Sequence, residues 1–366
     1  MKLKQKLMSL GLVVTLVASS FFTSSAATKQ DMKVEFINVG AGDAIYIETP
    51  DGTDILIDAG SATSGKKVVD YLLKQEKNMN LEYVISTHQD ADHAGGLQEV
   101  FKRMKVKKFY YPKDTAYTST KTGKAVMNLA KKEKGCKIYD AKTGTKIKSA
   151  GATLEFVHSK TNYKTDNEDS VMTYIDYGNL EMLLTGDAEK GAEAAGKKYN
   201  VDILQVPHHG SKGSSSTSFI KKYDPEKIII STDGKKYGHP AKEALDRYKK
   251  YDKNIDVYRT DRNGNIKVYA NGKKWWVKTD KSSSQKIGST KPGVTSSSSS
   301  SSKPSTSKPS TSKPSISNSK TVYITKTGKK YHYKKNCRGL SNANSIQTTT
   351  LSKAKSQGLT LCGYED

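Results

Sequence analysis

The feature that most constrains the fold is a repeated pattern along the chain. In it, an apolar run typical of a buried strand ends in His or Asp, which are residue types that commonly bind metal ions. The densest case follows the run 83–85, after which His88, Asp90, Asp92 and His93 occur within six residues. In an extended segment, residues two apart project to the same side, so His88 and Asp90 face one point and the last two turn toward a second. A simple turn requires no such interleaving of imidazole and carboxylate groups, so the loop is predicted to hold two metal ions.

The same pattern recurs further along the chain. Three more ligand-type positions follow apolar runs: Asp187, the pair His208 and His209, and His239. A carboxylate has two oxygens with which to bridge two cations, and Asp187 is therefore expected to reach the same edge of the fold as His88. Of the two other histidines, His158 stands at a strand end and is interpreted as structural or solvated, and His332 lies in the C-terminal part.

The order of the predicted elements favours a layered α/β domain over residues 31–280. Short apolar runs bounded by turn residues predict three consecutive strands, at 34–39, 44–48 and 54–58. A helix is predicted at 65–74, before the strand that leads to the metal loop. A meander of strands followed by helices indicates a sandwich of layers rather than a doubly wound sheet. Asp43 follows the glycines of a tight turn between the first two strands and is a candidate site residue.

The chain is strongly basic. It contains 61 Lys and Arg residues and 37 Asp and Glu residues, which gives a formal charge of +24. Such a charge attracts nucleic acid, anionic wall polymers and anionic membrane surfaces, and charge alone does not choose among these partners. At the N-terminus, lysines precede the apolar run 7–22, and small residues follow it. This pattern is typical of a secretory signal peptide at 1–27, since a membrane-spanning helix prefers about 20 apolar residues. A secreted or wall-associated protein with no membrane span in its mature chain is expected.

The composition changes after the predicted domain. Residues 281–320 are rich in Ser, Lys and Pro with few apolar side chains, and such a segment is expected to form an extended linker. Residues 321–366 are expected to form a small module, which contains Cys337 and Cys362. Domains this small usually need a metal ion or a disulfide. The third cysteine, Cys136, is expected to be a buried free thiol.

Residues 34–277 resemble the metallo-β-lactamase fold, and in particular the soluble hydrolase domain of the ComEC-type competence proteins and their free-standing secreted relatives. The resemblance rests on segments that keep both their order and their places at strand ends: NVGAGDA at 38–44, HQDADH at 88–93, LLTGD at 183–187, VPHHGS at 206–211, YGHP at 237–240 and TD at 260–261. The wider superfamily usually has histidine where Asp90 stands, and the competence-type branch has aspartate. Asn38 stands where that branch more often has aspartate.

This resemblance implies an αββα sandwich with a two-metal centre, of zinc or manganese, at one edge of its sheets. It implies these ligand roles: His88 and Asp90 hold one cation, Asp92, His93 and His209 hold the other, and Asp187 bridges them. The superfamily histidine that usually precedes the bridging aspartate is not evident. His158 is the one candidate by order, and the stretch around Asn167 is expected to supply contacts instead.

The remaining site residues are expected around the two cations. His208 and His239 would stabilise the transition-state oxygens or protonate the leaving group, and Asp92 is counted with them as a catalytic candidate. Lys212 would pair with a phosphate group. Further substrate contacts are expected from Ser211, Asn167 and Asp43.

The small C-terminal module resembles the zinc-binding tails of secreted nucleases and hydrolases, in which a histidine, a cysteine and a terminal Cys-x-x-Cys pair bind the metal. His332, Cys337 and Cys362 match that layout, and Glu365 stands at the last ligand position. Two alternatives stay open: Glu365 completes a weaker zinc site, or Cys337 and Cys362 form a disulfide.

Together these features predict a secreted, metal-dependent phosphodiesterase, namely a nuclease that acts on extracellular DNA through a two-metal centre. The lysines would contact the DNA backbone without reading its sequence. Two alternatives are hydrolysis of phosphodiesters in wall polymers or choline phosphates, and non-catalytic binding to DNA or wall polymer. A β-lactam substrate is not favoured, because only the shared fold points to it.

Overall fold

The structure is a computed structural model. It describes residues 31–75, 80–113, 115–159, 165–282, 284–287 and, with gaps, 321–362. The predicted signal peptide, most of the predicted linker and Glu365 lie outside the described residues.

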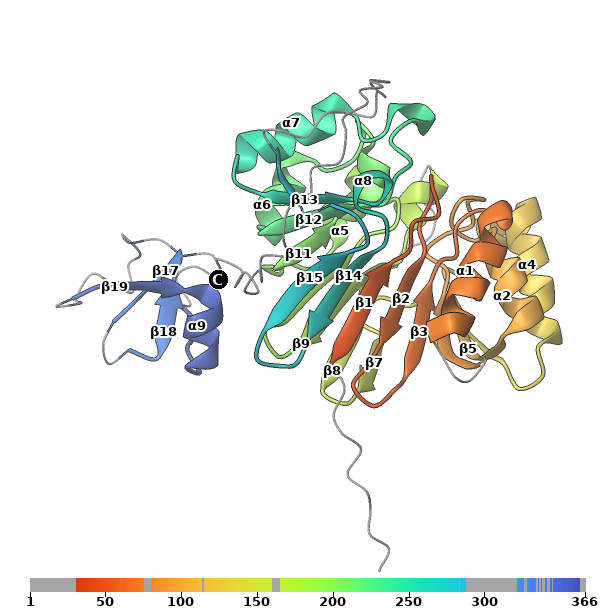
Figure 1. Ribbon diagram of the computed structural model, residues 1–366, viewed down its shortest axis with the longest axis horizontal. Coiled ribbons are helices and arrows are strands. Elements are labelled where there is room, and N and C mark those ends of the chain that lie inside the picture. The colour runs from red at the N-terminus through yellow and green to blue at the C-terminus, as the bar shows by residue number, and fades with distance from the viewer. Residues whose placement is uncertain are drawn as a thin grey trace, which may run out of the picture.

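Two mixed sheets pack face to face (Figure 1). Within the described ranges, the first sheet has eight strands in the order β15-β14-β1-β2-β3-β4-β5-β6. Their bounds, in that order, are Trp275–Thr279, Ile266–Ala270, Met32–Phe36, Ile45–Glu48, Asp54–Ile57, Asn80–Ile85, Lys105–Tyr111 and Lys137–Asp140. Strands β1 to β3 form the antiparallel meander that the sequence predicts, and β3 to β6 run parallel.

The second sheet has the order β16-β13-β12-β11-β10-β9-β8-β7. Its strands, in that order, span Gln285–Lys286, Asp256–Arg259, Lys227–Ile230, Ile203–Gln205, Leu180–Leu184, Met172–Tyr177, Ala152–His158 and Lys146–Ser149. Strands β10 to β13 run parallel, and β7 to β10 run antiparallel.

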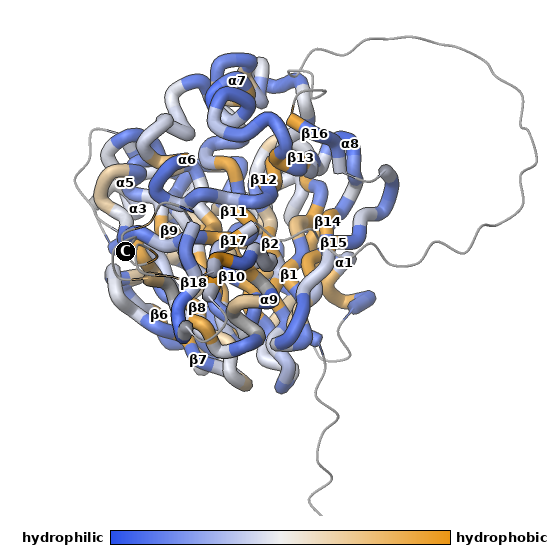
Figure 2. Tube along the Cα trace, turned by 90° about the vertical axis from the view of Figure 1, so that its left-hand side faces the viewer, coloured by the Kyte–Doolittle hydropathy of each residue, from blue (hydrophilic) through white to orange (hydrophobic). Residues whose placement is uncertain are grey.

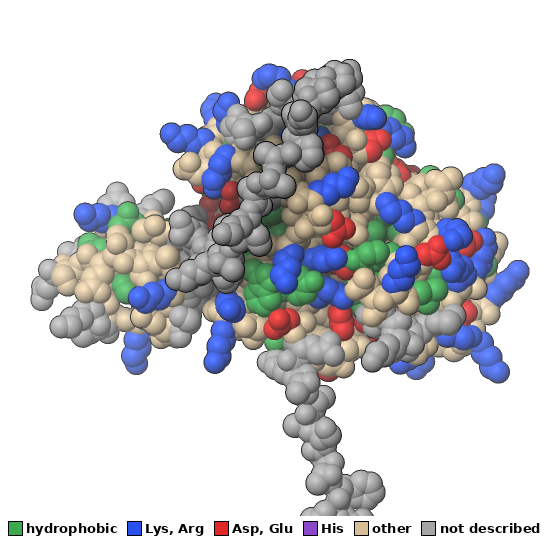
Figure 3. Space-filling view, in the orientation of Figure 1, with side chains coloured by type: hydrophobic (Ala, Val, Ile, Leu, Met, Phe, Trp, Pro, Cys, Tyr) green, Lys and Arg blue, Asp and Glu red, His purple; other side chains and the backbone are tan. Residues whose placement is uncertain are grey.

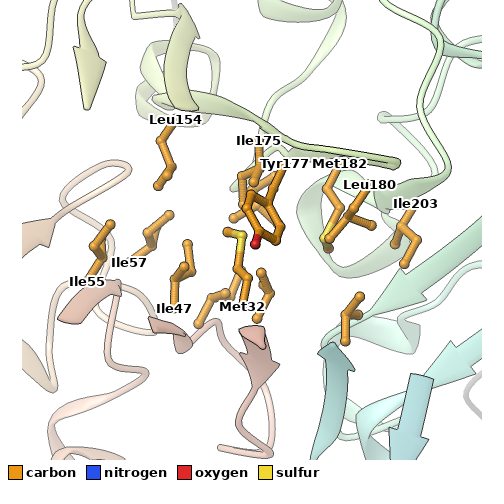
Figure 4. Close-up of a cluster of buried hydrophobic side chains, with 14 of the residues drawn as sticks. Met32, Ile47, Ile55, Ile57, Leu154, Ile175, Tyr177, Leu180, Met182 and Ile203 are labelled. Atoms are coloured by element: carbon orange, nitrogen blue, oxygen red, sulfur yellow. The ribbon is translucent and has the colours of Figure 1, made fainter. Parts of the chain in front are cut away.

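An apolar layer fills the space between the sheets (Figure 4). Ile55 and Ile57 of the first sheet face the layer to which Leu154 and Ile175 of the second sheet belong. Leu56 lies between the two isoleucines and points to the opposite face of its sheet, because successive side chains of a strand alternate. The central strands are thus apolar on both faces, which explains why they read as continuous apolar runs in the sequence.

Helices cover the outer face of each sheet (Figure 1). Over the first sheet lie α1 (Ala62–Gln75), α2 (Leu97–Arg103), α3 (Thr115–Ser119) and α4 (Lys121–Lys132). Over the second lie α5 (Lys190–Ala195), α6 (Thr217–Tyr223) and α7 (Lys242–Tyr251). The layer order is αββα, as predicted, and Figure 2 shows hydrophobic strands inside a largely hydrophilic exterior. Among the described residues, no helix combines the length and the apolar character needed to cross a membrane.

Loops at the carboxyl ends of parallel strands gather at one edge of the sandwich. In the first sheet β3 and β4 are parallel neighbours, and in the second sheet β10, β11 and β12 are. The loop after β4 carries His88 and His93, the loop after β10 carries Asp187, and the loop after β11 carries His209. Parallel strands end at the same edge of a sheet, so the topology brings these side chains together.

The folded domain reaches further than the sequence indicates. Strand β16 pairs with β13, and Ile287 is buried among the helices and strands of the second sheet. The domain was expected to end at residue 280 and the linker to begin at residue 281. The polar residues of β16 carry no apolar periodicity, which is why composition places the boundary too early.

The C-terminal module has its own small sheet, in the order β19-β17-β18-β20. Its elements are β17 (Thr321–Ile324), β18 (Lys330–His332), β19 (Gln347–Thr350), α9 (Leu351–Ser356) and β20 (Thr360–Leu361). Among its described residues, one cluster of four buried apolar side chains includes Val322 and Tyr331, and a smaller one joins Leu340 to Cys337 and Cys362. So few buried apolar groups contribute little stability, in line with the expected need for a metal ion or a disulfide.

Candidate metal centre

Four buried side chains converge between the two sheets, at the edge where the parallel strands end. They are Asp43, His93, Asp187 and His209, and one ligand atom from each lies within 4.8 Å of the others. Each residue comes from a different loop, after β1, β4, β10 and β11 respectively. A group assembled from four distant parts of the sequence depends on the whole fold rather than on one local motif.

Hydrogen bonds fix the orientation of the two imidazole rings in this group. His93 Nδ1 donates to Asp58 Oδ2 at 2.9 Å, and His209 Nδ1 donates to the Ser231 carbonyl oxygen at 2.9 Å. Both rings therefore turn Nε2 toward Asp187, whose Oδ1 lies 3.1 Å from His93 Nε2 and 3.4 Å from His209 Nε2. The two Nε2 atoms are 3.2 Å apart, so the point between them needs a positive charge, either a shared proton or a cation.

A second donor pair lies beside the first group. Thr87 Oγ1 donates to Asp58 Oδ2 at 2.5 Å, so it accepts from His88 Nδ1, which lies 3.0 Å away. His88 Nε2 then carries a lone pair, is buried without a hydrogen-bond partner, and lies 3.6 Å from Asp90 Oδ2. The His88 and His93 ring centroids are 4.3 Å apart. Two adjacent sets of metal donors therefore fit a dinuclear site.

Asp43 belongs to the four-membered group, although the sequence suggests it only as a substrate contact. Its Oδ2 accepts from Gln205 Nε2 at 2.6 Å and lies 3.8 Å from His93 Nδ1, while its Oδ1 is buried without a hydrogen-bond partner. Burial, opposed by His209 and His93, raises the pKa of the Asp43 carboxyl group. A buried carboxyl group with an unpartnered oxygen beside two imidazoles is what a cation site requires.

Asp92 is expected as a metal ligand and is not one of the four converging residues. It is half-buried, and its carbonyl oxygen accepts from the Asp43 backbone N–H at 3.3 Å. A Cβ atom on Gly42 would lie 2.2 Å from that carbonyl oxygen, so the two loops are in backbone contact. Asp92 thus holds the Asp43 loop in place through its main chain, and a ligand role for its side chain stays a prediction.

Asp58 is a functional residue that the sequence analysis overlooks. Its carboxylate is fully buried and accepts from Thr87 N at 2.8 Å as well as from Thr87 Oγ1 and His93 Nδ1. Asp58 follows β3 directly, so it repeats the pattern of an apolar strand that ends in a ligand-type residue. That pattern is the signal from which Asp58 could have been predicted.

The charges of the centre are strongly coupled. Burial alone raises the pKa of Asp187, but His209 and His93 outweigh it and hold the pKa well below the ordinary value. Burial alone lowers the pKa of His93, but Asp187 and Asp58 outweigh it and raise the pKa well above the ordinary value. Protons and cations therefore compete for the same face of the centre.

Two further histidines stand at the rim. His208 Nδ1 donates to Glu189 Oε1 at 3.0 Å, and its Nε2 lies 3.5 Å from Asp187 Oδ2. The Asn167 amide nitrogen lies 3.4 Å from His208 Nδ1. The His239 ring centroid lies 5.4 Å from that of His208, and burial, followed by repulsion from His208 and His209, lowers the pKa of His239 to about 4. The two histidines predicted to be catalytic therefore lie together at the rim.

The other predicted contacts are more peripheral. Ser211 is buried and its Oγ accepts from the Gly213 backbone N–H at 3.2 Å, which stabilises the turn after His209. Lys212 is exposed, and its carbonyl oxygen accepts from Arg247 at 2.9 Å. His158 is buried and its Nδ1 donates to the Ser170 carbonyl oxygen at 2.8 Å, which agrees with a structural interpretation.

Asn38 has a structural role at the end of β1. Its side chain donates to the Thr260 carbonyl oxygen at 2.9 Å, and its backbone N–H donates to Asn265 Oδ1 at 2.8 Å. These bonds join β1 to α8 (Thr260–Asn263), near the loop that carries Asp43.

The C-terminal module contains a separate cluster of His332, Cys337 and Cys362, all buried, with ligand atoms within 4.8 Å of one another. Strands β18 and β20 pair in parallel with Tyr331 opposite Leu361, so the residues that follow each of these two lie side by side. The two sulfur atoms are 3.9 Å apart. Cys136 lies apart from this cluster, is half-buried, and burial raises the pKa of its thiol to about 11.

Comparisons with known proteins agree with this architecture. Residues 37–232 match the family described as the metallo-beta-lactamase superfamily. The chain is 29% identical over 256 residues to ComE operon protein 3 of Bacillus subtilis, which covers 64% of this chain and 32% of that protein. It is 32% identical over 249 residues to recombination protein 2 of Haemophilus influenzae, which covers 63% of this chain and 28% of that protein. The chain thus spans about a third or less of the length of these relatives.

A solved structure has a similar arrangement. It is the metallo-beta-lactamase fold protein YhfI from Bacillus subtilis, with a TM-score of 0.44, 14% sequence identity, and coverage of 68% of this chain and 100% of that chain. The family match extends over more than half of the sequence and includes the loops that carry His93, Asp187 and His209. The chain belongs to the metallo-β-lactamase superfamily and has homologues among proteins named for competence and recombination.

Proposed function

We propose that this chain is a metal-dependent phosphodiesterase that cleaves DNA outside the cell. The observation that carries the proposal is the orientation of three buried imidazoles, His88, His93 and His209. Each is held through Nδ1, and each turns Nε2 toward a carboxylate, which is Asp90 for His88 and Asp187 for the other two. Buried polar groups without partners cost free energy of folding, so these donors do not stabilise the fold. Their fixed orientation suits the binding of metal ions, on which the hydrolases of this superfamily depend.

The donor set divides into two groups that would each hold one cation. His93, His209 and Asp43 would hold the first cation together with Asp187, and His88 and Asp90 would hold the second, with Asp187 as the ligand that both would share. Two bound cations would supply Lewis acidity and a nucleophilic water at neutral pH. The mixture of imidazole and carboxylate ligands suits zinc and manganese.

The rim residues divide the proton chemistry between them. Glu189 orients His208, so the Nε2 atom of His208 faces the centre and is placed to give a proton to the leaving oxygen. His239 has a pKa of about 4, so it is neutral at pH 7 and can donate a hydrogen bond to a phosphate oxygen without carrying charge. Of the two histidines, His208 is therefore the better candidate for the general acid.

DNA is the proposed substrate for two reasons. The formal charge of +24 favours a polyanion, and Figure 3 shows Lys and Arg side chains spread over the whole viewed face rather than in one patch. The named relatives are competence and recombination proteins, whose names refer to processes that handle DNA. Secretion is proposed from the basic, apolar and small-residue segments of the N-terminus.

The test is cleavage of linear and plasmid DNA by the chelator-treated protein after manganese or zinc is added back. Wild-type protein should cleave DNA only with added metal, and Asp187→Asn should lose at least about 100-fold in rate, since a direct ligand matters at least as much as its supporting residues. Hydrolysis of bis-p-nitrophenyl phosphate without DNA cleavage would move the substrate to other phosphodiesters, such as those of wall polymers or choline. Inactivity on both would favour a non-catalytic binding protein.

A further inference from the structure

Tyr237 stands out on the surface next to the candidate metal centre. Its side chain is 73% exposed, and the other exposed large hydrophobic side chain among the described residues is Tyr139, at 38%. Tyr237 lies in the short 3-10 helix η3 (Lys236–Gly238), between β12 and α7. An aromatic ring this open to water gains nothing from burial, so packing does not account for its presence.

The backbone of Tyr237 adopts a conformation that an aromatic residue rarely takes. Its φ angle is 56°, in the left-handed region, although Gly238 stands beside it in the sequence. Two hydrogen bonds support this shape of the loop, because Asp233 Oδ1 accepts from Lys235 N at 2.9 Å and from Lys236 N at 2.8 Å. Left-handed residues other than glycine persist where surrounding structure enforces them, and they gather at functional sites.

Left-handed backbone also marks the centre itself. Asp58, His208 and His209 have φ angles of 55°, 49° and 52°. The loop of Tyr237 thus shares the strained backbone of the residues that build the site. Its position follows the same logic, because the loop comes directly after β12, the strand next to the one that delivers His209.

A series of rings leads from the metal donors to Tyr237. The ring centroids of His209 and His239 are 6.4 Å apart, and those of His239 and Tyr237 are 5.9 Å apart. His209 Nε2 contacts Asp187 Oδ1 at 3.4 Å. Tyr237 is thus separated from His209 by one ring, that of His239. If a phosphodiester is held at the centre, the chemical group attached to it would lie near Tyr237.

Two lysines stand next to the ring. Lys235 and Lys236 are exposed, and Lys236 Nζ lies 4.7 Å from the centroid of the Tyr237 ring. Phosphates are attracted to this loop, whereas the quaternary ammonium of a choline group is repelled by it. An aromatic face flanked by lysines is the arrangement that proteins use to stack bases of single strands while pairing their phosphates.

We propose that Tyr237 stacks on a base of single-stranded nucleic acid whose phosphodiester lies at the metal centre, and that it sets the preference for nucleotides over other phosphodiesters. The inference rests on the proposed function and names its substrate class. Tyr237 is a binding residue for the substrate and takes no part in bond cleavage.

The experiment compares two single-stranded DNA oligonucleotides of equal length, one with bases and one built entirely of abasic tetrahydrofuran units. Wild-type protein, Tyr237→Ala, Tyr237→Phe and the control Tyr139→Ala are assayed for kcat and KM. Base stacking on an aromatic ring predicts that Tyr237→Ala raises KM for the normal strand by about 5- to 150-fold and leaves kcat unchanged. Tyr237→Phe and Tyr139→Ala should resemble the wild type, and none of the three variants should alter cleavage of the abasic strand.

An equal loss on both strands, or no loss on the normal strand, would overturn the inference. If the wild type cleaves neither strand, the assay on linear and plasmid DNA still decides the proposed nuclease function. Anisotropy binding to labelled versions of the same two strands then decides the inference separately. Tighter binding of the normal strand that disappears in Tyr237→Ala would support stacking, and equal binding of both strands by the wild type would refute it.

Discussion

The Asp58→Asn substitution changes one proton acceptor behind the metal centre and almost no volume. The carboxylate accepts from Thr87 N, Thr87 Oγ1 and His93 Nδ1, at 2.8, 2.5 and 2.9 Å. An asparagine can keep its oxygen toward Thr87 N, but its NH₂ group then faces His93 Nδ1. His93 must respond by moving its proton to Nε2, the atom that faces Asp187.

The expected result is a loss of metal affinity in the folded protein, measured separately from any loss of stability in the metal-free protein. Replacement of the residue that orients a ligand costs about 10–100-fold in metal affinity, which is about 1.4–2.7 kcal/mol. The measurement is competition with a chromophoric chelator, together with urea unfolding of the metal-free protein. Unfolding should change by at most about 3 kcal/mol, the value of a hydrogen bond to a charged group.

A matched control is Asp51→Asn. Asp51 lies in the turn between β2 and β3 and accepts from Thr49 Oγ1 at 2.5 Å and Ser149 Oγ at 2.7 Å. It should leave metal affinity unchanged. If Asp58→Asn binds metal as tightly as the wild type, Asp58 does not set the tautomer of His93, and the account of the centre's orientation is wrong.

Three further outcomes are expected. Burial lowers the pKa of His239 from 6.5 to about 4, so between these pH values the unfolded chain binds a proton that the folded chain does not. The free energy of unfolding of the metal-free protein, measured with a chelator present, should therefore fall as the pH drops from about 6.5 to 4. His239→Gln should make that fall smaller. Gly42→Ala places a Cβ 2.2 Å from the Asp92 carbonyl oxygen and should cost about 3 kcal/mol or more in urea unfolding, whereas Gly40→Ala, also at positive φ but with open space, should cost about 1–2 kcal/mol. The sulfur atoms of Cys337 and Cys362 are 3.9 Å apart. Two thiolates on a tetrahedral zinc with bonds of about 2.3 Å lie about 3.8 Å apart, so the double serine variant should hold about one zinc fewer by mass spectrometry. Unchanged zinc, with Cys136 as the one free thiol of the wild type, would indicate a disulfide instead.

The sequence predicts the fold and the place of the centre well because both depend on local signals. Apolar runs of strand length are visible directly, and His88, His93, Asp187 and His209 each stand just beyond such a run. The topology then needs only the rule that the carboxyl ends of parallel strands meet. The pattern indicates a layered sandwich, and the resemblance to the metallo-β-lactamase fold implies the αββα order that the structure has.

The roles of the remaining acidic residues at the centre are harder to predict, because they depend on tertiary geometry. Asp43 appears in the sequence as a carboxylate after a glycine turn, and its place beside His93 arises from the pairing of loops far apart in the chain. Asp58 shows the strand-end pattern, but its role lies in a hydrogen bond across 35 residues. Asp92 is the reverse case, since a ligand-type residue in the motif contributes its carbonyl oxygen to the loop contact.

The exposed position of Tyr237 is also beyond sequence reasoning. Its motif is visible in the chain, but neither its left-handed backbone nor its exposure follows from residue types. A tyrosine next to a glycine is ordinarily interpreted as part of a turn. The loop shape that presents its ring depends on the hydrogen bonds of Asp233.

The most direct test of the central claim is an anomalous difference map from crystals soaked in manganese. Two peaks are expected beside Asp187, one next to His93 and His209 and the other next to His88 and Asp90. Loss of both peaks in Asp187→Asn crystals would agree with a shared bridge. A single peak, or peaks away from these residues, would contradict the two-cation centre on which the proposed phosphodiesterase depends.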